Sequence, residues 1–249
     1  MPVFIQKFCG RKIITLLLLL FLFGCGESSN PSGTSQPSSQ SKNPQELIRN
    51  ATEKQRIGAY DEAIVILLRA LELDPKFVPA YTRMGLVYSE ADQRSEAIDS
   101  FKKALEMDPK NLPAQLGLGE VYSKMTRNDL AVAEFLKAET LQPENKEILF
   151  KIALEYWYDQ KLNEASTYYN KILAIDPEHT QAHLNLISVY EKLKDWEKAL
   201  KEIEISKQLG KKNNNTQTIA IAERKLAFIK GRMNMTDKDY KRKSQPPFE

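Results

Sequence analysis

The chain has 249 residues and a formal net charge of +3, an excess that comes wholly from Lys7, Arg11 and Lys12, because residues 1–24 contain no Asp or Glu. The rest of the chain carries 33 basic and 33 acidic side chains, and this balance argues against nucleic acid as the main ligand. The two cysteines are Cys9 and Cys25, so residues 26–249 contain neither a disulfide nor a free thiol.

The N-terminal segment has the order of parts that is typical of a secretion signal. The three basic residues precede an apolar run from Ile13 to Phe23. As a helix this run would span about 16 Å, too short for a hydrocarbon core of about 30 Å and suited to the h-region of a signal peptide. The run ends in Leu22-Phe23-Gly24-Cys25, which resembles the lipobox of bacterial lipoproteins.

In lipoproteins the cysteine thiol receives a diacylglyceryl group and the chain is cleaved before that cysteine. The resemblance therefore implies a signal peptide over residues 1–24 and a lipid anchor at Cys25, since two or three acyl chains hold a protein on a membrane durably. The alternative is an uncleaved signal anchor with an incidental cysteine. Residues 25–43 are rich in Ser, Pro and Gly, which predicts a flexible tether with a reach of about 23 Å.

From residue 44 onward, the same residue types return every 34 positions. The columns are prolines at Pro75, Pro109, Pro143 and Pro177, alanines at Ala63, Ala97, Ala131, Ala165 and Ala199, tyrosines at Tyr88, Tyr122, Tyr156 and Tyr190, and bulky residues at Leu67, Phe101, Phe135, Tyr169 and Ile203. A register of this kind predicts a stack of identical supersecondary units rather than a single-domain enzyme.

Each unit is expected to contain two helices. In one unit Tyr81, Met84, Gly85 and Tyr88 share a face of a first helix, and Ala97, Phe101 and Ala104 share a face of a second. Gly85 and Gly119 would allow two helices to approach closely. The prolines should end the second helices near Asp74, Asp108, Gln142 and Asp176. Helices of about 12–14 residues are marginal alone, so neighbouring units must cover their apolar faces.

This 34-residue unit resembles the tetratricopeptide repeat, most clearly from Val78 to Asn111, and the resemblance implies a right-handed all-α solenoid. We expect five repeats at residues 44–77, 78–111, 112–145, 146–179 and 180–212, of which the first and last are degenerate. Ile219, Ala222, Leu226 and Ile229 lie at helical spacing, which predicts a capping helix over residues 213–232. Residues 233–249 are predicted to form a basic disordered tail.

The resemblance implies that the concave face of the first helices holds an extended peptide or a partner helix. The lysine and asparagine pattern of the family's carboxylate clamp is absent, because Lys151 and Asn185 are isolated. The predicted groove residues are Thr82, Leu86, Leu116, Glu120, Phe150, Leu154, Trp157, Tyr158, Leu184 and Ser188. Trp157 is the strongest candidate, since tryptophan is a favoured interface anchor. The alternatives are that Trp157 packs against the next repeat or that the tail around Phe248 covers it.

Nothing in the sequence points to catalysis, a cofactor or a bound metal. The two histidines, His179 and His183, form an i, i+4 pair, which we interpret as a surface and packing feature at a solvent-accessible repeat junction rather than as a metal site. Glu202 and Glu204 are interpreted as solvated faces. No phosphate-binding loop or nucleophile motif occurs.

These features together predict a lipid-anchored, periplasm-facing scaffold or adaptor of the bacterial envelope, supporting the assembly of a pilus, a secretion channel or outer-membrane proteins. The alternative is a recruiter of peptidoglycan-processing enzymes. Gly26 follows the cysteine in place of the aspartate retention signal, which favours the outer membrane. From Ile205 onward there are eleven basic and four acidic residues. That end would suit an acidic partner or anionic lipid, or would simply form a solvated face.

Overall fold

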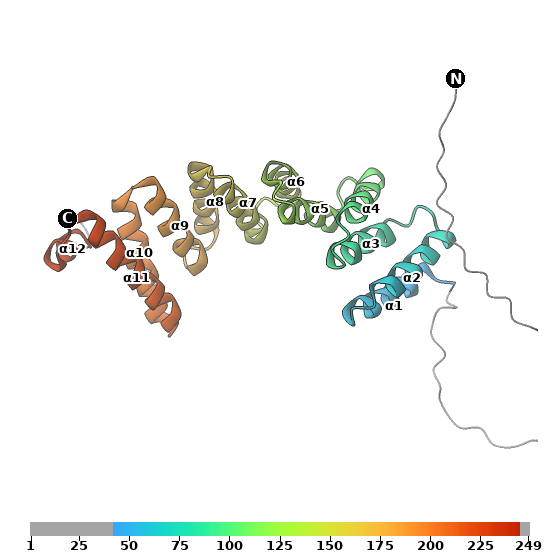
Figure 1. Ribbon diagram of the computed structural model, residues 1–249, viewed down its shortest axis with the longest axis horizontal. Helices are drawn as coiled ribbons and strands as arrows, with labels where there is room; N and C mark the ends of the chain where they lie inside the picture. The colour runs from blue at the N-terminus through green and yellow to red at the C-terminus, as the bar shows by residue number, and fades with distance from the viewer. Residues whose placement is uncertain (1–41, 245–249) are drawn as a thin grey trace, which may run out of the picture. The chain divides into compact units, whose positions relative to one another are not determined.

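The computed structural model describes residues 42–244, and all regular structure in this part of the chain is α-helical (Figure 1). The five helix pairs are α1 (Pro44–Arg56) with α2 (Tyr60–Leu73), α3 (Val78–Glu90) with α4 (Arg94–Met107), α5 (Leu112–Lys124) with α6 (Asn128–Leu141), α7 (Lys146–Tyr158) with α8 (Leu162–Ile175), and α9 (Thr180–Leu193) with α10 (Trp196–Lys212). Two further helices follow, α11 (Thr216–Met233) and α12 (Asp237–Ser244). The predicted all-α solenoid is confirmed. The predicted signal peptide, Cys25 and nearly all of the tether lie outside the described residues.

The second helices end where the prolines predict. α2, α4, α6 and α8 stop at Leu73, Met107, Leu141 and Ile175, each one residue before Asp74, Asp108, Gln142 and Asp176. The fifth second helix, α10, has Lys211 at the proline position and runs to 17 residues instead of 14. Proline therefore sets the length of these helices, because it disfavours helical geometry in the residue before it.

The repeated columns form the core. The alanines of the second helices are all fully buried, and their bulky partners Leu67, Phe101, Phe135, Tyr169 and Ile203 are at most 1% exposed. Gly85 and Gly119 lie directly against this column. A Cβ atom on Gly85 would stand 2.5 Å from the Phe101 ring, and one on Gly119 would stand 2.5 Å from the Phe135 ring. The predicted close approach of the two helices at these glycines is confirmed.

The turn between the two helices of each repeat also recurs every 34 residues. Its central residue has a positive φ in all five repeats: Gly58 (77°), Asp92 (58°), Thr126 (56°), Gln160 (58°) and Lys194 (58°). Only the first repeat has the glycine that this left-handed conformation favours. The other four repeats hold strained turns in place through the packing of the two helices on either side.

The C-terminal part departs from prediction at one point. The capping helix α11 packs against α10 and buries Ala222, Leu226 and Ile229, as the spacing indicated. The tail, however, is not wholly disordered from residue 233, since α12 forms over Asp237–Ser244. Its anchor is Tyr240, which is 8% exposed and donates a hydrogen bond of 2.9 Å to Glu204. Glu204 is therefore not the purely solvated group that its charged surroundings suggested.

No helix among residues 42–244 combines the length and the apolar character that crossing a bilayer requires.

Candidate functional site

The predicted groove residues lie on the first helices of repeats two to five, where positions 34 apart occupy equivalent places. Leu86, Leu116, Glu120, Phe150, Leu154, Trp157, Leu184 and Ser188 are half-buried. Thr82 is buried, and its hydroxyl donates a hydrogen bond of 3.2 Å to the Val78 carbonyl oxygen. Tyr158, by contrast, is 60% exposed. An exposed tyrosine beside a half-buried tryptophan is a typical composition for a binding surface.

Four of the predicted residues meet in one small cavity, which we call the aromatic hollow. Its volume is about 220 Å³. It is lined by Leu154, Trp157 and Tyr158 of α7, Tyr169 of α8, and Asn185 and Ser188 of α9. The hollow therefore spans two consecutive repeats.

Sequence reasoning missed two residues of this hollow. Tyr169 was assigned only to the bulky core column, and Asn185 was considered only as an isolated member of the carboxylate-clamp pattern. In the structure the Asn185 amide donates a hydrogen bond of 2.9 Å to the Tyr169 hydroxyl and accepts one of 3.0 Å from Gln181. Burial raises the pKa of Tyr169 to about 12, so its hydroxyl stays protonated at neutral pH. The hollow thus combines apolar walls with neutral polar groups.

A lysine lies at the edge of the hollow. Lys192 places its Nζ atom 4.5 Å from the centroid of the Trp157 ring, and the same ammonium donates a hydrogen bond of 2.9 Å to the Gln160 side chain. Trp157 also packs against the buried cluster of repeats four and five. Trp157 therefore contacts the next repeat, as one interpretation expected, and it also lines the hollow, while its role as a binding anchor stays a prediction.

A second cavity, of about 480 Å³, lies near the start of the solenoid and includes Thr82 and Leu86. Ile48, Pro79, Arg83 and the Asp108–Pro113 connection complete its lining. Leu116, Glu120, Phe150 and Leu184 line neither cavity. Glu120 instead forms an ion pair of 2.7 Å with Lys151. A charged pair therefore joins α5 and α7 between the two cavities.

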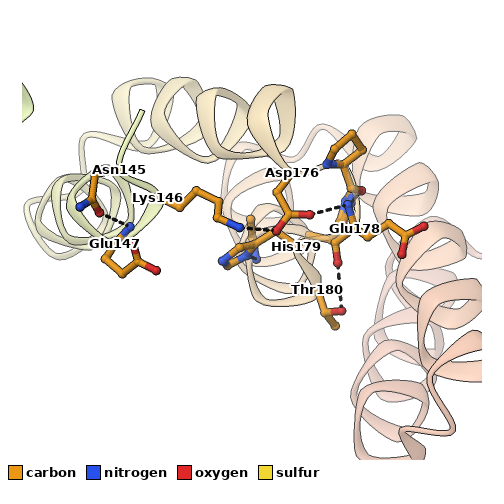
Figure 2. Close-up of polar contacts among 10 residues, drawn as sticks. Asn145, Lys146, Glu147, Asp176, Glu178, His179 and Thr180 are labelled. Carbon is orange, nitrogen blue, oxygen red and sulfur yellow. Dashed lines mark hydrogen bonds and ion pairs between the residues drawn. The ribbon is translucent and has the colours of Figure 1, made fainter. Parts of the chain in front are cut away.

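The connection between α8 and α9 is held by polar contacts (Figure 2). Lys146 of α7 reaches the Asp176 carboxylate at 2.7 Å, and that carboxylate also accepts a hydrogen bond of 3.2 Å from the Glu178 backbone. His179 stands where earlier repeats have the helix-capping Asn111 and Asn145, and its Nδ1 atom accepts from the Ala182 backbone at 3.2 Å. His179 therefore acts as the N-cap of α9.

The second histidine is buried, which corrects the expectation of a solvent-accessible junction. His183 is 4% exposed, and its two ring nitrogens lie 2.5 Å from a Glu202 oxygen and 2.9 Å from the Pro177 carbonyl oxygen. Glu202, interpreted from the sequence as solvated, is only 8% exposed. Both nitrogens of His183 are engaged, and among residues 42–244 no group of three or more potential metal ligands comes together.

This pair makes the stability of the fold depend on pH. Burial alone would lower the pKa of His183, but the hydrogen bond to Glu202, together with that to Pro177, raises it above its usual value. A raised pKa contributes stability that is complete below the pKa of the unfolded chain and is lost as pH rises through the folded value. We expect the free energy of unfolding to fall as pH rises above about 6.5, the ordinary pKa of histidine. Denaturant titrations should show a weaker dependence for His183→Gln, and an equal dependence would contradict this assignment.

Comparison with protein-family models shows which family the chain belongs to. Models described as tetratricopeptide repeat match residues 51–77, 78–111, 112–145 and 156–211, which together make up more than half of the chain. The chain belongs to the tetratricopeptide repeat family. A comparison with curated proteins found no match.

Several solved structures share the fold. The crystal structure of YrrB, a TPR protein with an unusual peptide-binding site, is 24% identical with a TM-score of 0.60, over 74% of this chain and 91% of YrrB. A crystal structure of MamA is 22% identical with a TM-score of 0.63, over 69% of this chain and 93% of MamA. The MamA fragment from Desulfovibrio magneticus RS-1 is 20% identical with a TM-score of 0.59, over 68% and 94% of the two chains. At these identities the likeness shows the fold.

Proposed function

We propose that this tetratricopeptide protein is a non-enzymatic adaptor, anchored through Cys25 to a membrane of the bacterial envelope, that supports the assembly of an envelope complex. The aromatic hollow would hold part of the partner protein, as an extended peptide or a helix. The observation that carries the proposal is the exposed Tyr158 beside the half-buried Trp157 on the first-helix face of the fourth repeat.

Repeat packing does not account for these two side chains. The positions equivalent to Trp157 are Gln55, Ser89, Ser123 and Glu191, and those equivalent to Tyr158 are Arg56, Glu90, Lys124 and Lys192. Each of these repeats folds with a polar residue at the same place. The repeat fold therefore does not require an aromatic residue at either place, although Trp157 also packs against the core here. Two such side chains beside a cavity support a role in binding.

The function is tested by site-specific crosslinking in envelopes. A photoreactive amino acid at position 154, inside the hollow, is expected to join the chain to one defined partner protein. The matched control is the same amino acid at position 103, an exposed site on α4.

Tyr158→Ala should weaken partner binding by about 2 kcal/mol. Because Tyr158 is exposed, the Tyr158→Ala protein should have a melting temperature near that of the wild type. Equal crosslinking at both sites, or unchanged binding by Tyr158→Ala, would reject the adaptor role of this face.

The anchor is tested separately. The basic segment, the short apolar run and Leu22-Phe23-Gly24-Cys25 support lipidation, and the repeats begin soon after, at Pro44. We expect Cys25→Ser to leave a larger, unprocessed precursor and to abolish labelling by a fatty-acid analogue. Normal labelling of that variant would end the lipoprotein assignment, without bearing on the binding face.

A further inference from the structure

The positive charge of Lys192 beside the aromatic hollow indicates the chemistry expected of its occupant. Lys192 has no carboxylate partner among residues 42–244, since its ammonium bonds the neutral Gln160 amide and lies over Trp157. Two other lysines, Lys151 of α7 and Lys225 of α11, are instead paired with carboxylates, with Glu120 at 2.7 Å and with Glu191 at 2.6 Å. The contact between repeats four and five therefore keeps an uncompensated positive charge.

The acidic residues next to Lys192 and to Gln160 in the sequence are already paired with other lysines. Glu191, the neighbour of Lys192, is the partner of Lys225, and Asp159, next to Gln160, forms an ion pair of 2.7 Å with Lys161. A cation over an aromatic ring remains a full charge, because the ring contributes only its quadrupole. Lys192 is thus available to a carboxylate brought by another molecule.

Lys192 and the hollow share one face of α9. Asn185, Ser188 and Lys192 are spaced i, i+3 and i+7, so the ammonium lies about one turn beyond the polar wall of the hollow. Trp157 joins the two features, because it lines the hollow and also underlies the ammonium. A group seated in the hollow would therefore have Lys192 next to it.

The size of the hollow limits the occupant to about one side chain. Its volume of 220 Å³ is below the roughly 300–1,000 Å³ of sites for cofactors and drug-sized molecules. Leucine, tryptophan and tyrosine walls favour an apolar or aromatic group, while Asn185 and Ser188 can bond the backbone on either side of it.

Resting on the proposed function, we propose that the aromatic hollow binds a peptide segment of a partner protein in which a large apolar side chain is followed closely by an acidic residue. The apolar side chain enters between α7 and α9, and the carboxylate pairs with Lys192. Lys192 is exposed, so the ion pair adds only modest affinity. Its main effect is to set the direction of the segment along the face.

The test uses the full chain in a mild detergent and fluorescein-labelled peptides. One peptide contains Phe-Glu-Glu, a second Phe-Gln-Gln and a third Ser-Glu-Glu, each flanked by Gly and Ser. We expect fluorescence anisotropy to show the first peptide binding about threefold more tightly than the second, as an exposed ion pair allows, and at least about tenfold more tightly than the third, which lacks the apolar side chain. Lys192→Gln should remove the preference for Glu over Gln and leave the affinity for the second peptide unchanged.

The matched control is Lys124→Gln. Lys124 occupies the position equivalent to Lys192 two repeats earlier and also contacts a neutral partner, Ser89, but it lies outside the hollow lining. This variant should bind all three peptides as the wild type does. Failure of every peptide to bind at millimolar concentration, or an acid preference that survives Lys192→Gln, overturns the proposal. If the peptide proposal is overturned in this way but Tyr158→Ala still weakens binding of the natural partner, the proposed adaptor function remains supported.

One other occupant has similar chemistry. The sequence places Phe248 before Glu249, in residues outside those described. If the full chain fails to bind the Phe-Glu-Glu peptide and a chain that ends at Ser244 binds it, the occupant is the protein's own tail and the proposal of a partner segment is overturned. Equal binding by the two chains supports the partner segment.

Discussion

Replacing Gly119 by leucine is expected to lower the free energy of unfolding by about 3 kcal/mol. A single Cβ atom at this position would stand 2.5 Å from the Phe135 ring, and Phe135 is only 1% exposed, so the ring has no free space to move into. A leucine side chain must therefore displace α6 from α5 or force strained rotamers. Chemical denaturation followed by circular dichroism measures the loss.

The control for this prediction compares the same substitution, glycine to alanine, at Gly119 and at Gly231. Gly119→Ala meets the Phe135 ring and should destabilise the fold, whereas a Cβ atom on Gly231 in α11 meets nothing within 4 Å. Because alanine favours helix over glycine, Gly231→Ala should be neutral or stabilising by up to about 1 kcal/mol. Two variants with the same unfolding midpoint would show that α5 and α6 do not approach as described.

The second large effect is a gain in stability. Glu155 is 4% exposed and occupies the position where repeats two, three and five have the fully buried Val87, Val121 and Val189. One carboxylate oxygen accepts a hydrogen bond of 2.6 Å from Ser123, and the other is buried without a hydrogen-bond partner. Burying such a group costs about 1–3 kcal/mol. We therefore expect Glu155→Val to raise the free energy of unfolding by about 2 kcal/mol at pH 7.

The sign of the pH dependence gives an internal control. Burial raises the pKa of Glu155, against weaker opposing effects of Ser123 and Lys151. A raised pKa means that the cost of the carboxylate is absent below the unfolded pKa and develops as pH rises through the folded value. The gain from Glu155→Val should thus shrink near pH 4. Glu106→Val, at an exposed position on α4, should change stability by less than about 0.5 kcal/mol. A destabilised Glu155→Val chain would show that the carboxylate supports the fold.

The repeat architecture was predictable because it rests on chemistry that is local in sequence. Proline ends a helix wherever it occurs, and small or bulky residues at helical spacing define a buried face without knowledge of the neighbours. The same reasoning found the side of the aromatic hollow formed by Leu154, Trp157 and Tyr158, since those residues lie on one helix. It did not find Tyr169 and Asn185, because their place depends on how α8 and α9 pack against α7.

Charged residues misled the sequence interpretation for a related reason. Glu202 and His183 are 19 positions apart on two different helices and are buried together, a pairing that the spacing within one helix does not reveal. Alone, either group would be costly to bury, and only the pairing makes the burial acceptable. Tyr240 is similar, since α12 has little apolar character of its own. It is held through the hydrogen bond to Glu204 and through Lys230, whose Nζ atom lies 4.5 Å from the Tyr240 ring.

The aromatic hollow belongs to two repeats at once, and this has a consequence for cooperativity. In a linear array, the coupling between neighbours decides whether a segment opens alone or together with the next. An occupant that touches both α7 and α9 adds its binding free energy to that one coupling. Amide hydrogen exchange in these helices should then slow when the hollow is filled, while exchange in α1 and α2 should not change. Such an occupant would make repeats four and five, which otherwise open independently, open as a single cooperative unit.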